Sequence, residues 1–272
     1  GSGTVGKLPI IIDESYLDEI NTLVNANIAL AKADWDEHEN SWDFKTLPLV
    51  NGARTSLIEE AYNFWEATCL QRFNQLKDNE KRLNEIFIAI YGLENELNSE
   101  VKAEDVSIRL LSKEGAVKEF ISYAVGCMFG RYSLDVEGLV YAGGDWDSSQ
   151  YATFAADRDN IIPISDDEYF EDDIVGLFVE FVKTVYGADT LDENLKFIAD
   201  VLGGKGQPKD VIRNYFLNDF YKDHCDSYSI NGSGKRPIYW LFDSGKKNGF
   251  KALIYMHRYD ADTVGRVRTD YL

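Results

Sequence analysis

The sequence has 272 residues, 44% of them apolar and 28% charged, and its formal net charge is −19 at pH 7. These apolar residues are enough for one large or two small globular domains, and the acidity opposes non-specific binding to nucleic acid because phosphates are repelled on average. The longest apolar stretch, residues 120–130, is shorter than the roughly 20 residues of a membrane-spanning helix. The cysteines, Cys69, Cys127 and Cys225, are widely spaced and odd in number, which suits a reducing compartment. We therefore expect a soluble, cytoplasmic protein.

The first part of the chain predicts two helices. Gly1-Ser2-Gly3 looks like a cloning scar, so we expect a piece of a longer protein. Residues 8–12, LPIII, predict a short buried strand. Asp13 is expected to cap a helix from Glu14 to Glu37, and Ser56 with Glu59 to cap a long helix that ends near Tyr91. Each helix carries one apolar face at helical spacing, which predicts that the two pack as a hairpin.

The middle of the chain mixes helices with short apolar runs. Residues 106–111 and 138–144 predict strands, and Ala116–Phe129 predicts a buried helix that is apolar nearly all round. Two further helices are expected, one from Ser165 to Tyr186 and one from Thr190 to Leu202, each with an acidic residue three positions after its cap. This part is strongly acidic.

The last part combines a helix, Asp210–His224, with a β-hairpin, Lys235–Tyr259, and a short final helix from Asp262. Helices dominate and the sheet is minor, so the predicted class is α+β, predominantly helical with a small antiparallel sheet or hairpin near the C-terminus. The expected organisation is one continuous domain with these parts: 1–3 cloning scar, 4–105 helical hairpin region, 106–204 mixed helix and strand acidic region, 205–272 helix plus basic aromatic hairpin.

Motifs for catalysis or cofactors are weak. NGSGKRP fails as a phosphate-binding loop, because Ser229 and Arg236 stand where a glycine and a Ser/Thr are needed. The loops at 145–149 and 165–173 could offer oxygens to a cation but lack the EF-hand order, and solvated acidic surface is the simpler interpretation. Cys127 lies in an apolar helix, where a thiol is usually inert. We expect no catalytic, cofactor-binding or metal-ligating residue in this chain.

The hairpin is the most distinctive feature. Residues 231–272 hold eight Lys or Arg against four Asp, so the C-terminal end is basic within an acidic chain. Its first strand alternates imperfectly, with Ile238, Trp240 and Phe242 expected on one face. Lysines sit at its turn, where a loop can reach a partner. The alternative is an ordinary edge hairpin whose lysines keep other strands from adding. The candidate contacts to nucleic acid or to a partner protein are Lys235, Arg236, Lys246, Lys247, Lys251 and Arg258.

Several blocks resemble a known family in both their residues and their order. SWDFKTLPL, NEIFIAIYGLENEL, FISYAVGCMFGRYSLD, FYKDHCDSYS and KRPIYWLFDSGKKNGFKALIYMHRYDADTV are similar to the C-terminal region of PglX-type adenine-specific DNA methyltransferases of bacterial BREX phage defence. Related blocks occur in type IIG restriction–modification enzymes. The resemblance implies a parent enzyme that transfers a methyl group from S-adenosylmethionine to adenine in DNA.

The resemblance does not bring the catalytic loop with it. Such enzymes need an Asn/Asp-Pro-Pro-aromatic loop around the flipped adenine, and no two of the five prolines here are adjacent. We therefore expect a non-catalytic region that holds no cofactor and supports recognition of DNA by the parent enzyme. Docking of other phage-defence proteins and a purely structural spacer role stay open as alternatives.

Overall fold

The computed structural model describes residues 9–51, 55–108, 110, 112–229, 236–245 and 249–272. It divides into two compact units, one formed by residues 1–35 and 66–110 and the other by residues 36–65 and 111–272. The class is α+β, as predicted, because helices predominate and three strands form an antiparallel sheet. No helix among the described residues is both long enough and apolar enough to cross a membrane.

The first unit is built on a helical hairpin. A 3₁₀ turn, Glu14–Tyr16, is capped by the Asp13 side chain and leads into α2, Leu17–Trp35. The helix α4, Ile58–Tyr91, contributes its C-terminal part to this unit. The two helices run antiparallel: the Arg82 guanidinium bonds Glu19 at 2.7 Å, and the Asn79 amide donates to Asn27 at 2.8 Å. The helical periodicity of the sequence thus predicted both the helices and their pairing.

Three predicted strands do not form in the described residues. Residues 9–12 lie exposed without regular structure. Val106 and Ile108 are buried, but they pack against Leu76 from an irregular segment that follows the 3₁₀ turn Ala103–Asp105. Residues 138–144 are bends and irregular backbone, in which Gly138, Gly143 and Gly144 have positive φ. A short apolar run therefore becomes a strand here only where another strand offers it backbone hydrogen bonds.

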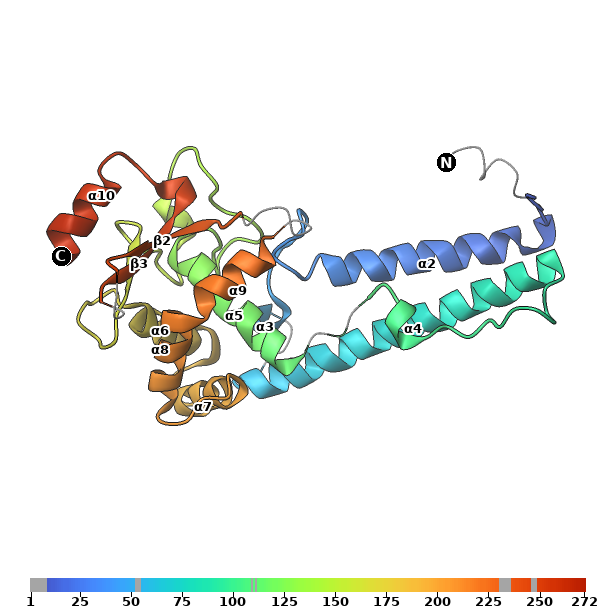
Figure 1. Ribbon diagram of the computed structural model, residues 1–272, viewed down its shortest axis with the longest axis horizontal. Helices are drawn as coiled ribbons and strands as arrows, with labels where there is room; N and C mark the ends of the chain where they lie inside the picture. Colours follow the sequence, from blue (N-terminus) through green and yellow to red (C-terminus); the bar gives the residue numbers. More distant parts are fainter. Residues whose placement is uncertain (1–8, 52–54, 109, 111, 230–235, 246–248) are drawn as a thin grey trace. The chain divides into compact units, whose positions relative to one another are not determined.

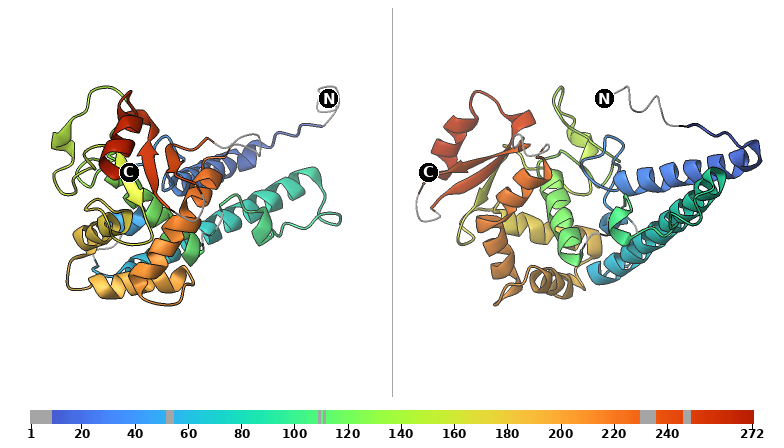
Figure 2. Two further views of the ribbon diagram at one scale, coloured as in Figure 1. Left: turned by 60° about the vertical axis from the view of Figure 1, so that its left-hand side comes forward. Right: turned by 45° about the vertical axis from the view of Figure 1, so that its right-hand side comes forward.

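The second unit packs its helices around α5, Lys113–Met128, which is capped by Ser112 and buries most of its C-terminal half. Figures 1 and 2 show α5 in bright green among the yellow and orange helices. The other helices of this unit are α3 Pro48–Asn51, α6 Ile174–Tyr186, α7 Leu191–Val201, α8 Pro208–Asn218, α9 Phe220–Ser227 and α10 Thr263–Arg266, followed by a π turn at Val267–Tyr271.

The predicted C-terminal hairpin is confirmed. Strand β2, Tyr239–Asp243, pairs with β3, Lys251–Tyr255, and β3 also pairs with β1, Ile161–Ile164. The order β1-β3-β2 leaves β2 at an edge of the sheet. Pro163 is tolerated because β1 is the opposite edge strand, where a missing N–H group need not break a ladder.

Helix starts in this unit are set by tertiary contacts as well as by local caps. The helix α6 begins eight residues later than predicted, because its cap is Asp173 and not Ser165: the Asp173 side chain accepts the N–H groups of Val175 and Gly176. At the start of α4, the Ile58 N–H group donates to the Asn194 side chain at 2.8 Å. The helix predicted over 210–224 is split at Asp219 into α8 and α9.

Candidate functional site

The structure describes three of the six basic residues predicted to make contacts. Arg236, Lys251 and Arg258 are described, and Arg236 is exposed. Lys251 donates to the Leu217 carbonyl at 3.0 Å. Lys235, Lys246 and Lys247 lie outside the described residues. The contact role of all six remains a prediction.

Arg258 is engaged by the fold itself. Its guanidinium donates to the carbonyls of Phe129 at 3.2 Å and Asp157 at 2.8 Å. The same group lies 4.1 Å from the ring centroid of Trp146, within the range of a cation–π contact. The side chain therefore joins the end of the hairpin region to two preceding loops, whatever else it contacts.

An aromatic groove lies along the exposed edge strand. It has a volume of about 400 Å³ and is lined by Tyr221, Pro237, Tyr239, Trp240, Met256 and Tyr259. Trp240 and Tyr259 are 37% and 44% exposed, and their rings stand 5.9 Å apart at 63°. Arg236 directly precedes Pro237 in the chain. The groove thus contains partly exposed aromatic side chains and adjoins a basic residue in the chain.

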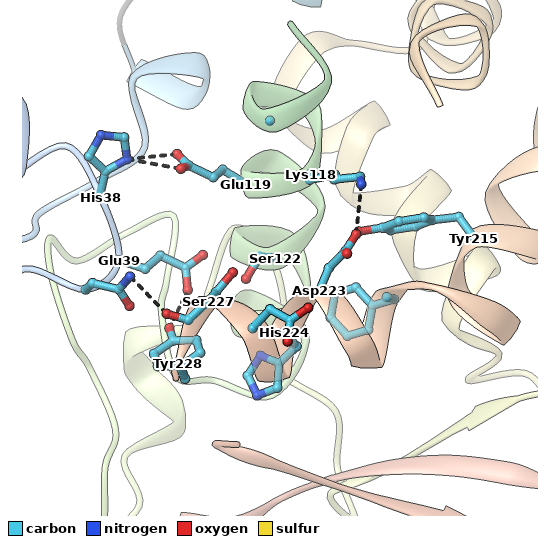
Figure 3. A pocket seen from close by; sticks show the side chains of 14 residues that line it. His38, Glu39, Lys118, Glu119, Ser122, Tyr215, Asp223, His224, Ser227 and Tyr228 are labelled. Atoms are coloured by element: carbon cyan, nitrogen blue, oxygen red, sulfur yellow. Dashed lines mark hydrogen bonds and ion pairs between the residues drawn. The ribbon is translucent and has the colours of Figure 1, made fainter. Parts of the chain in front are cut away.

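A second hollow, here called the Glu39 pocket, has a volume of about 410 Å³. Figure 3 shows its side chains converging from the loop after residue 37, from α5, and from α8 and α9 with the residues that follow them. The loop supplies His38 and Glu39, and α5 supplies Lys118, Glu119 and Ser122. The other labelled lining residues are Tyr215, Asp223, His224, Ser227 and Tyr228.

Glu39 is the central carboxylate of this pocket. Its Oε2 atom accepts the Tyr228 hydroxyl at 2.9 Å and the Tyr132 hydroxyl at 3.5 Å, whereas its Oε1 atom has no hydrogen-bond partner among the described residues. Burial raises the pKa of Glu39 to about 7. Hydrogen bonds from Tyr228 and Ser122 and the positive charge of Arg131 oppose this rise, and the negative charge of Glu119 adds to it. Burial therefore favours the protonated form of this carboxyl group.

His224 joins the Glu39 pocket to the aromatic groove. Its Nε2 atom accepts the N–H groups of Ile238 at 3.0 Å and Tyr239 at 3.3 Å, so the ring proton resides on Nδ1. The residue is 3% exposed, and burial followed by the positive charge of Arg131 lowers the pKa of His224 to about 4. A neutral imidazole thus fixes the start of β2 against α9.

Lys118 and His38 engage other carboxylates of the pocket. Lys118 lies 3.0 Å from Asp223 and 2.8 Å from Glu114, and His38 lies 3.1 Å from Glu119. Dashed lines in Figure 3 mark the contacts of Lys118 and His38 across the pocket. No local pattern in the sequence indicates this arrangement, because residues 38–39, α5 and α9 meet only in the folded unit.

A third cluster contains Asp157, Asp159 and Asp172, whose carboxylate oxygens lie within 4.8 Å of one another and could hold a metal ion. The Tyr271 hydroxyl bridges Asp159 at 3.0 Å and Asp172 at 2.5 Å. Burial raises the pKa of Asp157, with a smaller contribution from Asp159. Hydroxyl bridging and retained protons are sufficient to explain why three carboxyl groups lie so close.

Comparison with known proteins places the chain within longer sequences. No protein-family model matches it. It is 47% identical over 278 residues to the adenine-specific methyltransferase PglX of Lacticaseibacillus casei (strain Zhang), which covers 99% of this chain and 22% of that protein. It is 37% identical over 306 residues to the adenine-specific methyltransferase BrxX of Escherichia coli O9:H4 (strain HS), covering 100% of this chain and 24% of that protein. The chain thus spans about a quarter of the length of the curated relatives it matches.

Proposed function

We propose that, as the C-terminal region of a PglX-type adenine-specific DNA methyltransferase of a phage-defence system, this chain supports recognition of the DNA target and does not itself carry out methyl transfer. The observation that favours a DNA role is the aromatic groove beside Arg236 on the exposed strand β2. Two lysine-bearing segments, residues 230–235 and 246–248, adjoin the hairpin strands in sequence. Aromatic faces next to cations are the combination that stacks bases and holds phosphates.

The residues present do not fit S-adenosylmethionine, the methyl donor that the relatives' activity implies. A nucleotide-type cofactor site of this kind uses a glycine-rich turn between a parallel strand and a helix. Here β1 pairs antiparallel and is followed by Ser165-Asp166-Asp167, and the N-terminus of α6 is already occupied by the Asp173 carboxylate. Together with the absence of adjacent prolines from the sequence, this supports a division of labour in which the methyl transfer belongs to the rest of the enzyme.

A DNA contact made by this chain must be local. The formal net charge of −19 repels phosphates at long range, so the contact needs short-range stacking and a few lysine–phosphate pairs. Each phosphate contact contributes a slope of about 0.9 to the dependence of log affinity on log salt concentration. Stacking contributes about 1–3 kcal/mol per base and depends weakly on salt.

We expect Trp240→Ala to weaken binding of this chain to duplex or single-stranded DNA about tenfold, with an unchanged salt slope, because a stacking face is removed. The double change Lys246→Ala, Lys247→Ala is expected to flatten the slope by about one for each phosphate that the native lysines neutralise. Fluorescence anisotropy of labelled DNA, measured between low and physiological salt, reads both quantities.

Matched controls separate these effects from general changes of charge or surface. Trp42 is fully exposed, at 101%, and lies outside the groove, so Trp42→Ala should leave affinity unchanged. The pair Lys205→Ala, Lys209→Ala removes two exposed lysines elsewhere and should leave the salt slope unchanged. If the native chain shows no DNA affinity, yet captures another component of the defence system, the chain is a protein-docking module and the DNA proposal fails.

A further inference from the structure

We propose that an exposed apolar stripe on α2 docks an apolar helix with basic flanks, supplied by the part of the parent enzyme that lies outside this chain. The stripe, here called the α2 stripe, consists of Leu17, Val24, Ile28 and Trp35. The proposal rests on the placement of this chain as the C-terminal region of a longer enzyme, and it is independent of the DNA role.

The α2 stripe forms one line along the helix. Its members follow one another at intervals of seven, four and seven residues, and a rotation of about 100° per residue places them within about 40° of one another around the helix axis. With 19 residues at about 1.5 Å each, α2 is roughly 28 Å long. This spacing is typical of the seam along which two helices pack.

The helix α4 covers a different side of α2. Asn27 accepts the Asn79 amide at 2.8 Å, and Leu30 packs against Leu76. Two residues turn a helix by about 200°, so Leu30 and Ile28 point in nearly opposite directions. None of the residues of α2, all of which the structure describes, is buried. The exposed fractions along the α2 stripe are 49% for Leu17, 38% for Val24, 61% for Ile28 and 54% for Trp35.

The rest of the parent enzyme is the expected source of the covering helix. About three quarters of each relative lies outside the part that this chain matches. The Tyr91 hydroxyl at the end of α4 donates to the Pro9 carbonyl at 3.0 Å and accepts the Ile11 N–H group at 3.4 Å. A preceding part of the enzyme would therefore join this unit beside the first turn of α2, where the stripe begins and where Ile10 and Ile12 are also exposed. A segment of the same polypeptide docks at a high effective concentration.

The charges beside the α2 stripe select the partner. Residues 9–35 carry five carboxylates and one ammonium group, from Asp13, Glu14, Asp18, Glu19, Asp34 and Lys32. A helix with Lys or Arg beside its apolar face would be attracted, whereas a second copy of this chain would bring the same acidic excess. A lipid surface is also a poor match, because helices that lie on membranes carry basic polar faces.

Cysteine labelling tests whether the stripe is covered. The native cysteines of this chain are buried, so a cysteine introduced at an exposed site should be the one that reacts with a maleimide. Ile28→Cys is expected to react at least about tenfold more slowly in the full-length parent enzyme than in this chain, because a covered thiol reacts only when the docked helix opens. The control is Ala33→Cys, which is exposed and lies about 140° from Ile28 around the helix. It should react at similar rates in both proteins, as measured by peptide mass mapping.

Photocrosslinking then identifies the covering segment. A photo-reactive phenylalanine in place of Asn25, an exposed residue about 60° from Ile28 around the helix, should give crosslinks in the parent enzyme that this chain alone does not give. These should join α2 to a peptide from outside this chain in the same polypeptide. Equal labelling of Ile28→Cys in both proteins would overturn the proposal, as would a parent enzyme that gives only the crosslinks of this chain. Crosslinks between two copies would assign the stripe to self-association and also overturn it. Neither measurement uses DNA, so both results are separate from the test of the DNA role.

Discussion

Replacement of Asp173 by alanine is expected to lower the free energy of unfolding by about 3–5 kcal/mol, as is typical when one partner of a buried ion pair is removed. Asp173 is completely buried, and its two carboxylate oxygens each accept an N–H group of Arg213 at 2.8 Å. The same carboxylate caps α6 through Val175 and Gly176. The substitution therefore leaves a largely buried guanidinium without its counter-charge and removes a helix cap, whose loss alone costs about 1 kcal/mol.

Urea denaturation followed by circular dichroism measures this loss. Asp173→Asn should fall between alanine and the native chain, because an amide oxygen can still cap the helix but carries no charge. The control is Asp200→Ala, which breaks the pair with Lys196 on the exposed face of α7 and should cost less than about 0.5 kcal/mol. A similar loss for Asp173 and Asp200 would show that burial does not govern the strength of these pairs.

Local sequence patterns predicted the elements whose determinants are themselves local. Helical spacing of apolar residues predicted α2, α4 and α5, and alternation around a lysine-bearing turn predicted the hairpin of β2 and β3. The start of α6 was missed because a capping pattern at Ser165 competed with Asp173. Arg213, which lies 40 residues away in sequence, donates to the Asp173 carboxylate and stabilises it at the helix start. A local capping pattern does not contain this contact.

The candidate sites could be predicted only in part. The aromatic residues and cations of the hairpin are contiguous in sequence, so their grouping was visible without a structure. The Glu39 pocket was not visible, because Glu39 and Tyr228 are 189 residues apart in sequence and yet share a hydrogen bond. The pKa of Glu39 is raised because α5 and the residues after α9 bury its carboxyl group. A single glutamate in a loop has no sequence pattern that predicts this burial.

The predicted contact residues also show how a basic cluster can serve two purposes. Arg236 is exposed, and Lys251 and Arg258 both donate to backbone carbonyls of other elements. The sequence alone does not show which of these positive charges is bonded within the fold and which is exposed. The structure distinguishes two cations that bond other segments of the second unit from one that faces solvent, and this difference can be measured.

Arg258→Ala is expected to lower the free energy of unfolding by about 2–4 kcal/mol, because hydrogen bonds made by a charged group contribute about 1.5–3 kcal/mol and the cation–π contact adds to them. The carbonyls of Phe129, Asp157 and Arg158 lose their donor, and the Trp146 ring loses the guanidinium that covers it. Chemical denaturation of this chain measures the effect.

Comparing the Arg236→Ala and Arg258→Ala variants tests whether Arg258 stabilises the fold or contacts DNA. Arg236→Ala should change stability by less than about 0.5 kcal/mol, as for most exposed sites, while reducing the salt slope of DNA binding if that residue contacts a phosphate. Arg258→Lys should recover little stability, since one ammonium group cannot reproduce a planar fork that reaches separate carbonyls and stacks on a ring. If Arg258→Ala instead left stability unchanged and altered only the salt slope, Arg258 would act as a phosphate contact, and its hydrogen bonds to the loops would contribute nothing to the fold.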